Sequence, residues 1–292
     1  MAGQETLVLV SILNGFAIGF LLFILAVGLS LVFGMMDVLN LAHGALFLGG
    51  AYLGAQFAGD GWGGFLGALG IAAVAGLAAG GVLSLMTEPL RRRSHLDQAL
   101  LTLGVALVVA ELLIIVFGDD PLAVPAPPGL DGSVAVFGAT YPAYRLVLIG
   151  FGAVLALVVH LVVDRTRVGA LVRATVADRE MVAALGVDNR LVKAGVFAVG
   201  SLLATTAGVL GGPVYGARPG LDSTILILAL VVVVIGGLGS VRGALVGALI
   251  IGQVDTLGRV LLPDLASFIL FAALAVVLVV RPQGLFGTAV AR

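Results

Sequence analysis

The chain has 292 residues, 61% of them hydrophobic and 11% charged, with a mean hydropathy of +1.22 and a formal net charge of −1. Because soluble domains carry roughly 25% charged residues, these charges are too few to cover a soluble surface. The charge gives no sign of a nucleic-acid partner, and the lack of cysteine excludes disulfides, thiolate metal sites and cysteine nucleophiles. We therefore expect an all-α integral membrane protein, a polytopic bundle of transmembrane helices.

A helix that spans a bilayer needs about 20 mostly apolar residues. The chain offers nine candidates, at residues 7–33, 41–58, 65–86, 99–117, 146–163, 194–210, 225–238, 244–262 and 268–280. Two of them, 41–58 and 244–262, are less regular, and half-helices or re-entrant segments would change the count, so we expect eight to ten spans. Residues 1–292 are interpreted as one transmembrane domain, with long connections at 118–143 and 164–192.

The positions of lysine and arginine predict the orientation, because cytoplasmic loops are enriched in both. Arg91, Arg92 and Arg93 follow the third candidate span. A second cluster follows the fifth span and comprises Arg165, Arg167, Arg173, Arg179, Arg190 and Lys193. Two spans separate the clusters, so both can lie inside, and the intervening proline-containing loop 118–144 has neither lysine nor arginine. With nine spans the N-terminus lies outside and the C-terminus inside.

Several kinds of chemistry are absent from the sequence. Lys193 is the only lysine and Ala194 follows it, so the chain has no Gly-Lys-Ser/Thr phosphate-binding loop. The three histidines have no metal-ligand spacing. Ser240, in Gly-Leu-Gly-Ser-Val, is the nearest approach to a nucleophile elbow, and its glycines are better explained by packing. We expect no catalytic residues, no metal and no cofactor, and therefore not an enzyme.

The first polar constellation in a membrane segment is Asp37, Asn40 and His43. Their spacing of three would place them on one face of a helix. Polar groups at membrane depth often line a pathway, although a short interfacial turn exposed to water explains them equally well. Gly34 and Gly44 suggest a broken entry into the next span, and broken helices are tolerated beside a cavity.

The second constellation is glycine-rich. Gly239, Gly243 and Gly247 follow one another at steps of four, a double GxxxG pattern that makes one helix face flat for close packing. Bare backbone near a turn could also line a transport route. Gln253 follows at a depth from which it could face that route, whereas Asp255 could simply lie near the outer interface.

The basic connection 164–192 is too polar to span a membrane. Residues 177–185 contain good helix formers, Asp178 suits the helix start, and Gly186 can end the helix in a left-handed conformation. The apolar side chains form one stripe: Met181, Val182 and Leu185. This predicts a short amphipathic helix, which would either lie on lipid headgroups or dock into a groove of a cytoplasmic partner.

Several segments carry a resemblance to a known family. They are Asn14-Gly15, VFGMMDVLNLAHGALFLGGAY (32–52), EPLRRRS (88–94), RVGALVRATVADREMVAALGVDNRLVK (167–193), GGLGSVRGALVGALIIG (236–252) and RPQGLFG (281–287). In this order they resemble the permease subunits of the branched-chain (hydrophobic) amino-acid ABC importers, specifically the first of the two related permeases. One departure is Thr87-Glu88, where such permeases often carry an aromatic-basic pair.

The resemblance implies a type II ABC importer-like permease in the bacterial inner membrane, which moves branched-chain amino acids inward. It implies a second, similar permease, two cytoplasmic ATPase subunits and a periplasmic or lipid-tethered binding protein as partners. The loop 164–192 would then hold the coupling helix. Its contacts with the ATPase would include Arg173, Glu180, Met181, Ala184, Leu185 and Gly186. The translocation path would be bordered by Asn14, Asn40, His43, Gly44 and Gln253.

Two alternatives stay open on the sequence alone. Related permeases serve urea, short amides or aromatic acids, and no motif here separates these substrates. An ion-coupled secondary transporter would need no ATPase, but it usually shows intramembrane acids or broken helices paired between two halves. Glu111, in the fourth candidate span, gives that alternative little support.

Overall fold

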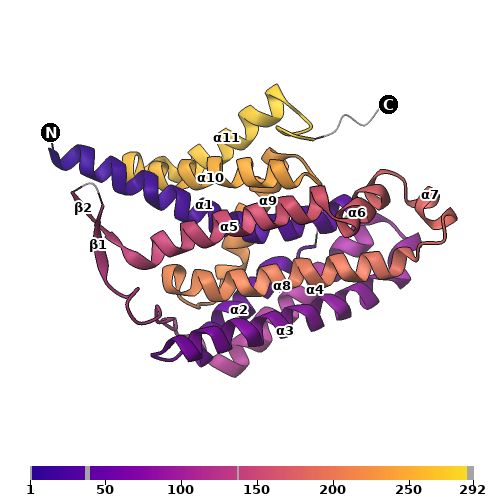
Figure 1. Cartoon of the computed structure of the whole chain (residues 1–292), viewed down its shortest axis with the longest axis horizontal. Helices are drawn as coiled ribbons and strands as arrows, with labels where there is room; N and C mark the ends of the chain where they lie inside the picture. The colour runs from indigo at the N-terminus through magenta and orange to yellow at the C-terminus, as the bar shows by residue number, and fades with distance from the viewer. Residues whose placement is uncertain (1, 37–39, 137, 288–292) are drawn as a thin grey trace.

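The computed structural model describes residues 2–36, 40–136 and 138–287. Its long helices lie roughly side by side along the longest axis of the molecule (Figure 1). The helices are α1 (Ala2–Met36), α2 (His43–Phe57), α3 (Trp62–Thr87), α4 (His95–Phe117), α5 (Ala143–Arg165), α6 (Arg167–Ala177), α7 (Arg179–Ala184), α8 (Asn189–Tyr215), α9 (Leu221–Gly236), α10 (Val241–Leu261) and α11 (Ala266–Val280). Two 3-10 turns, η1 (Pro89–Arg92) and η2 (Pro263–Leu265), and an antiparallel hairpin of β1 (Ser133–Val136) and β2 (Ala139–Pro142) complete the described elements.

Six of the described helices are long and apolar enough to cross a membrane, namely α1, α3, α4, α5, α8 and α10. Each of the nine candidate spans overlaps a helix, but the count of nine spans is not confirmed, because α2, α9 and α11 have only 15, 16 and 15 residues. At 1.5 Å per residue such helices reach about 24 Å, less than a hydrocarbon core of about 30 Å. The segment 244–262, expected to be less regular, belongs to the continuous helix α10. The chain is a polytopic helical membrane protein.

Side-chain caps fix where several helices begin, by accepting hydrogen bonds from backbone N–H groups that the first turn leaves unpaired. Ser94 and Asp97 form a reciprocal capping box at the start of α4. The side chains of Thr166, Asp188 and Ser240 cap α6, α8 and α10 in the same way. The caps of α4, α8 and α10 lie where apolar segments begin after polar connections, so short polar residues fix the starts of these helices.

Helix α1 lies at the centre of the bundle and packs on α5, α8, α9 and α10. Small residues allow the closest approaches between helices. A Cβ atom on Gly252 of α10 would lie 2.3 Å from the carbonyl oxygen of Gly15 in α1, and one on Gly80 of α3 would lie 2.4 Å from that of Phe197 in α8. No side chain fits at either position, so these glycines explain why the helices lie so close.

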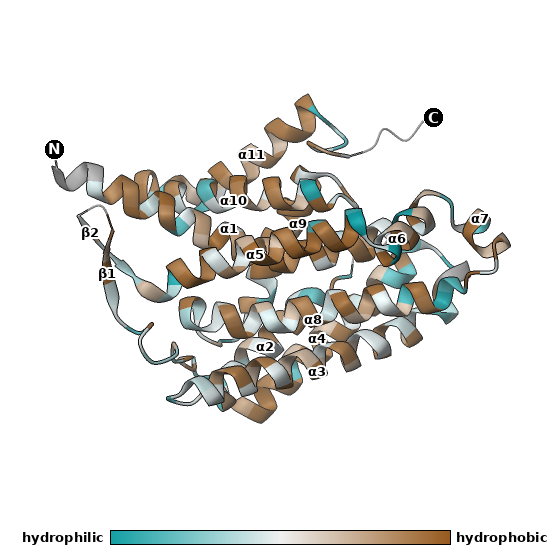
Figure 2. Ribbon diagram, viewed as in Figure 1, coloured by the Kyte–Doolittle hydropathy of each residue, from teal (hydrophilic) through white to brown (hydrophobic). Residues whose placement is uncertain are grey.

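The two ends of the bundle differ in character. Helices α6 and α7 lie at one end, and the β1–β2 hairpin lies at the other, beside the start of α1 (Figure 1). Apolar residues run along the helices, whereas hydrophilic residues gather toward the end that carries α6 (Figure 2). The candidate functional residues are therefore described by region: the end that carries α6 and α7, the end that carries the hairpin, and the buried middle of the bundle.

Candidate functional site: a coupling surface and a polar route

The basic connection contains two helices. The predicted helix at 177–185 corresponds to α7, whose start is capped by Asp178: its carboxylate accepts a hydrogen bond from the backbone N–H of Met181 at 2.9 Å. Gly186 follows α7 with φ 85°, the left-handed conformation that ends the helix. Helix α6, which precedes it, was not anticipated. Asp178 separates the two with an extended backbone, φ −153° and ψ 97°.

Helix α7 exposes apolar side chains at the end of the molecule. Met181 is 58% exposed and Leu185 is 76% exposed, whereas Val182 is 5% exposed and holds α7 against the rest of the protein. The remaining residues expected to contact an ATPase here are also exposed: Glu180, Ala184 and Gly186. Arg173 lies apart from them on α6. The predicted apolar stripe is thus divided, with two members free to bind a partner.

Asp164, in the last turn of α5, ties three helices together at this end. Its carboxylate lies 2.7 Å from a guanidinium nitrogen of Arg242 at the start of α10, and 3.7 Å from one of Arg173 on α6. His160, one turn earlier on α5, has its Nδ1 atom 3.0 Å from the same carboxylate. One acidic side chain therefore joins α5, α6 and α10 at this end of the molecule.

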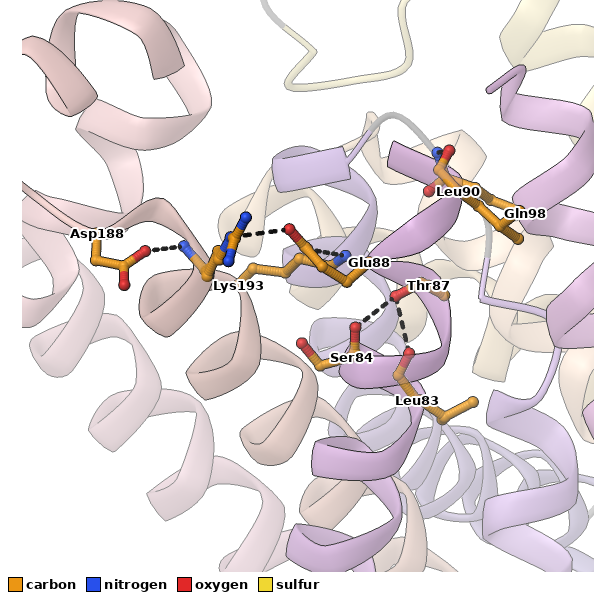
Figure 3. A network of polar contacts seen from close by, with 9 residues as sticks. Leu83, Ser84, Thr87, Glu88, Leu90, Gln98, Asp188 and Lys193 are labelled. Atoms are coloured by element: carbon orange, nitrogen blue, oxygen red, sulfur yellow. Dashed lines mark hydrogen bonds and ion pairs between the residues drawn. The ribbon is translucent and has the colours of Figure 1, made fainter. Parts of the chain in front are cut away.

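A second ionic junction joins α3 to α8 (Figure 3). Glu88, directly after α3, places one carboxylate oxygen 3.1 Å from Nζ of Lys193 and the other 3.2 Å from Nε of Arg190. The Lys193 side chain is 1% exposed. Because a buried charge is costly unless it is paired, Glu88 is what allows Lys193 to remain in the interior. The departure from the family pattern at Thr87-Glu88 thus supplies the partner of the only lysine in the chain.

Asn14 lies on α1 and Gln253 on α10, two helices that pack on each other near the hairpin end of the bundle. The Gln253 side chain donates a hydrogen bond to the carbonyl oxygen of Ile12 at 3.0 Å and lies against Gly15. Asn14 accepts a hydrogen bond from the guanidinium of Arg145, in the first turn of α5. Sequence reasoning missed Arg145, although an arginine beside the arginine-free outer loop was a usable signal.

The other expected path residues lie deep in the described structure. His43, at the start of α2, is fully buried, and its Nε2 atom lies 3.1 Å from the carbonyl oxygen of Leu25 in α1. Asn40 is buried in the turn before α2, so it does not share a helical face with His43 as expected. A Cβ atom on Gly44 would lie 2.4 Å from the carbonyl oxygen of Asp222, which is why α2 packs closely on α9. Asp37 lies outside the described residues.

The glycines of the second constellation divide between a turn and a helix. Gly243 and Gly247 lie in α10, directly against the α9 backbone at Gly236 and Val232. Gly239 lies in the turn before α10 with φ 76°, and its Cα faces Gly34. The three glycines therefore do not form the single flat helix face that their spacing suggested. Glu111 is exposed on α4, away from these groups.

Comparison with known proteins shows the family of the chain. The profile of the family described as "Branched-chain amino acid transport system / permease component" matches residues 11–278. The chain belongs to this family. It is 28% identical to the high-affinity branched-chain amino acid transport system permease protein LivH of Escherichia coli (strain K12) and to LivH of Salmonella typhimurium, over 98% of both chains. It is 26% identical to BraD of Pseudomonas aeruginosa, a permease protein with the same description, over 94% of both chains.

No solved structure matches the chain significantly. Membership of the permease family confirms the resemblance and the expectation that the chain is a transport component and not an enzyme. It also agrees with a multi-pass helical protein of the bacterial inner membrane, as its relatives are permeases and six of its described helices are long enough to span.

Proposed function

We propose that this chain is the transmembrane permease subunit of an ABC importer that moves branched-chain amino acids inward. The family match over residues 11–278 carries this proposal. Residues 1–292 act as a single permease domain that, lacking a phosphate-binding loop, receives its energy from other chains. Its partners are a second permease, two cytoplasmic ATPase subunits, and a periplasmic or lipid-tethered binding protein.

Helix α7 is the docking element for an ATPase subunit. An amphipathic helix docks by laying its apolar side chains into a groove of its partner, and Met181 and Leu185 are exposed on α7 in a manner that suits such a groove. Glu180, Ala184 and Gly186 would complete the contact. Arg173 would act from α6 by passing the movement to Asp164, at 3.7 Å.

In this orientation the α6–α7 end faces the cytoplasm, the N-terminus lies outside and the C-terminus inside. The support is the concentration of arginine in the connection 164–192 and its absence from 118–144. The β1–β2 hairpin then lies on the side from which a binding protein delivers substrate. ATP-driven closure of the ATPase pair would pull on α7 and open the route alternately to each side.

The translocation route would pass the polar residues of α1, α2 and α10. Asn14 and Gln253 would border its outer part, and Asn40, His43 and Gly44 its middle. Gly239, Gly243 and Gly247 would keep α10 close to its neighbours, so that small shifts of α10 change the width of the route.

The test is the double substitution Met181→Asp and Leu185→Asp. Two charges in the apolar contact should abolish co-purification with the ATPase subunits or leave ATP hydrolysis uncoupled from uptake, while the permease still assembles in the membrane. The matched control is Val168→Asp, because Val168 is an apolar side chain 65% exposed on the neighbouring helix α6. Normal uptake and normal ATPase binding in the double variant would contradict docking through α7.

A further inference from the structure

Arg145 carries a charge that no acidic group of the described structure neutralises. It lies half-buried in the first turn of α5, and its described side-chain partner is the neutral amide of Asn14. None of the ion pairs among the described residues includes Arg145. An arginine held by a neutral amide, rather than by a carboxylate, retains most of its capacity to bind an anion.

The neighbouring charged residues do not neutralise the Arg145 guanidinium. Asp255 and Arg259, one turn apart on α10, bind each other through contacts of 2.9 to 3.1 Å, and the Asp255 side chain is 9% exposed. This pair is therefore neutral as a unit. Tyr215, at the end of α8, lies within electrostatic range of Asp255, Arg259 and Arg145, so the three charged groups belong to one region. Among these three described charges, that of Arg145 is the one left without an opposite partner.

A hydrogen-bond donor without a partner among the described residues lies within electrostatic range of Arg145. Tyr141, in β2, is fully buried, and its hydroxyl has no hydrogen-bond partner among the described residues. Burial raises the pKa of this phenol to about 12, although the nearby Arg145 guanidinium acts in the opposite direction. Tyr141 therefore keeps its proton at neutral pH and remains a donor. Buried hydroxyls are normally paired, so an unpaired one within electrostatic range of an arginine that has no described carboxylate partner suits a ligand that accepts hydrogen bonds.

We infer that Arg145, positioned by Asn14 and assisted by the Tyr141 hydroxyl, binds the carboxylate of the substrate at the outer entrance of the route. This inference rests on the proposed function and on the orientation that places the hairpin end outside. The planar guanidinium can donate two parallel hydrogen bonds to a carboxylate. A neutral urea or amide has no carboxylate to pair with the guanidinium, so the site favours amino acids over those substrates.

The test uses proteoliposomes that contain the assembled complex, with leucine as the probe delivered by the binding protein. Arg145→Gln removes the charge and should lower leucine uptake about 10- to 100-fold, the range expected for one charge-assisted contact. Arg145→Lys keeps the positive charge but cannot donate two parallel hydrogen bonds to a carboxylate, so it should lower leucine uptake less than Arg145→Gln does. The matched control is Arg218→Gln, which removes an exposed arginine before α9 and should leave uptake within about twofold of the unmodified complex.

Two further measurements distinguish a loss of substrate binding at Arg145 from a loss of assembly or of binding-protein docking. Co-purification with the ATPases and the affinity of the leucine-loaded binding protein for the complex should be unchanged in Arg145→Gln. Equal uptake in Arg145→Gln and Arg218→Gln overturns the inference, and so does a loss of binding-protein affinity large enough to explain the lower uptake. If the Arg145→Gln variant fails to assemble, the Arg145→Lys variant provides the test. Leucine uptake by Arg145→Lys that equals uptake by the unmodified complex then overturns the inference. An unmodified complex that shows ATP-dependent import of acetamide and not of leucine overturns it as well, whereas failure to bind any ATPase would count against the proposed function.

Discussion

The carboxylate of Glu88, just after α3, lies 3.1 Å from the ammonium group of Lys193, in the second turn of α8. The two residues are 105 positions apart in the chain. Because Lys193 follows the α7 connection within a few residues, the pair attaches the exit of that connection to the tightly packed α3–α8 unit. The pair therefore joins α3 to α8 just beyond the α7 connection.

We expect Glu88→Ala to destabilise the protein, because it leaves the Lys193 charge buried without its carboxylate. Removing one partner of a fully buried pair costs about 3–5 kcal/mol, and the 27% exposure of the Glu88 side chain reduces this to about 1–3 kcal/mol. The measurement is the thermal unfolding midpoint of the purified permease. The double variant Glu88→Met with Lys193→Met should lose less, and an equal or larger loss in the double variant would speak against the pair.

Asp164→Asn should loosen the coupling between ATP hydrolysis and transport. The substitution removes the charge that holds Arg242 and Arg173, so α6 can move without α10. The effect on stability should be small, about 0–1 kcal/mol, because both arginines are largely exposed. The ratio of leucine imported to ATP hydrolysed should fall, whereas Asp131→Asn, in the exposed connection at the other end, should leave it unchanged. An unchanged ratio in Asp164→Asn would show that α6 does not act through this carboxylate.

Gly80 and Gly81 provide a matched pair for the packing of α3 on α8. A Cβ atom at Gly80 would lie 2.4 Å from the carbonyl oxygen of Phe197, whereas one at Gly81 would have no described heavy atom within 4 Å. Gly80→Ala should therefore cost about 1–3 kcal/mol by overpacking, and Gly81→Ala should be neutral or gain about 0.5–1 kcal/mol of helix stability. Thermal unfolding of the two variants compares them directly. Similar midpoints would mean that α3 and α8 are not in this close contact.

Alanine substitutions of the residues assigned to the route should differ in their effects on leucine uptake and on the unfolding midpoint. Asn14→Ala and Gln253→Ala should lower leucine uptake about three- to tenfold, since each removes one hydrogen-bonding group at the outer part of the route. His43→Ala should lower both uptake and the unfolding midpoint, because the imidazole is fully buried against α1. Thr224→Ala, at an exposed position of α9, is the control. Unchanged uptake in all three variants would make these residues purely structural.

Local signals predicted the apolar helices and the ends of α7, but not helix α6. Apolar runs identify membrane helices because lipid forces the backbone to pair within each segment, and Asp178 and Gly186 act on backbone groups only a few residues away. The same kind of signal explains one error. Ser240 caps α10 through the N–H of Gly243 at 3.0 Å, which places Gly239 before the helix and interrupts the expected glycine face.

The tertiary pairs could not be predicted in this way. Asn14 and Arg145 are 131 positions apart, and nothing in the sequence near either residue indicates the other. Their pairing follows from how α1 and α5 pack, and that depends on the whole bundle. Helix lengths within the membrane are similarly determined by packing, which is why α2 and α9, each an apolar run, are shorter than a full span.

The most direct test of the proposed function is leucine uptake by proteoliposomes that contain this permease with its ATPase subunits, second permease and binding protein. Uptake should require ATP on the side of the membrane that carries the ATPase subunits, and it should cease when those subunits are omitted. The rate of uptake should not change when the proton and sodium gradients are abolished. Uptake that proceeds without the ATPases and follows an ion gradient would contradict an ATP-driven importer and would identify a secondary transporter instead.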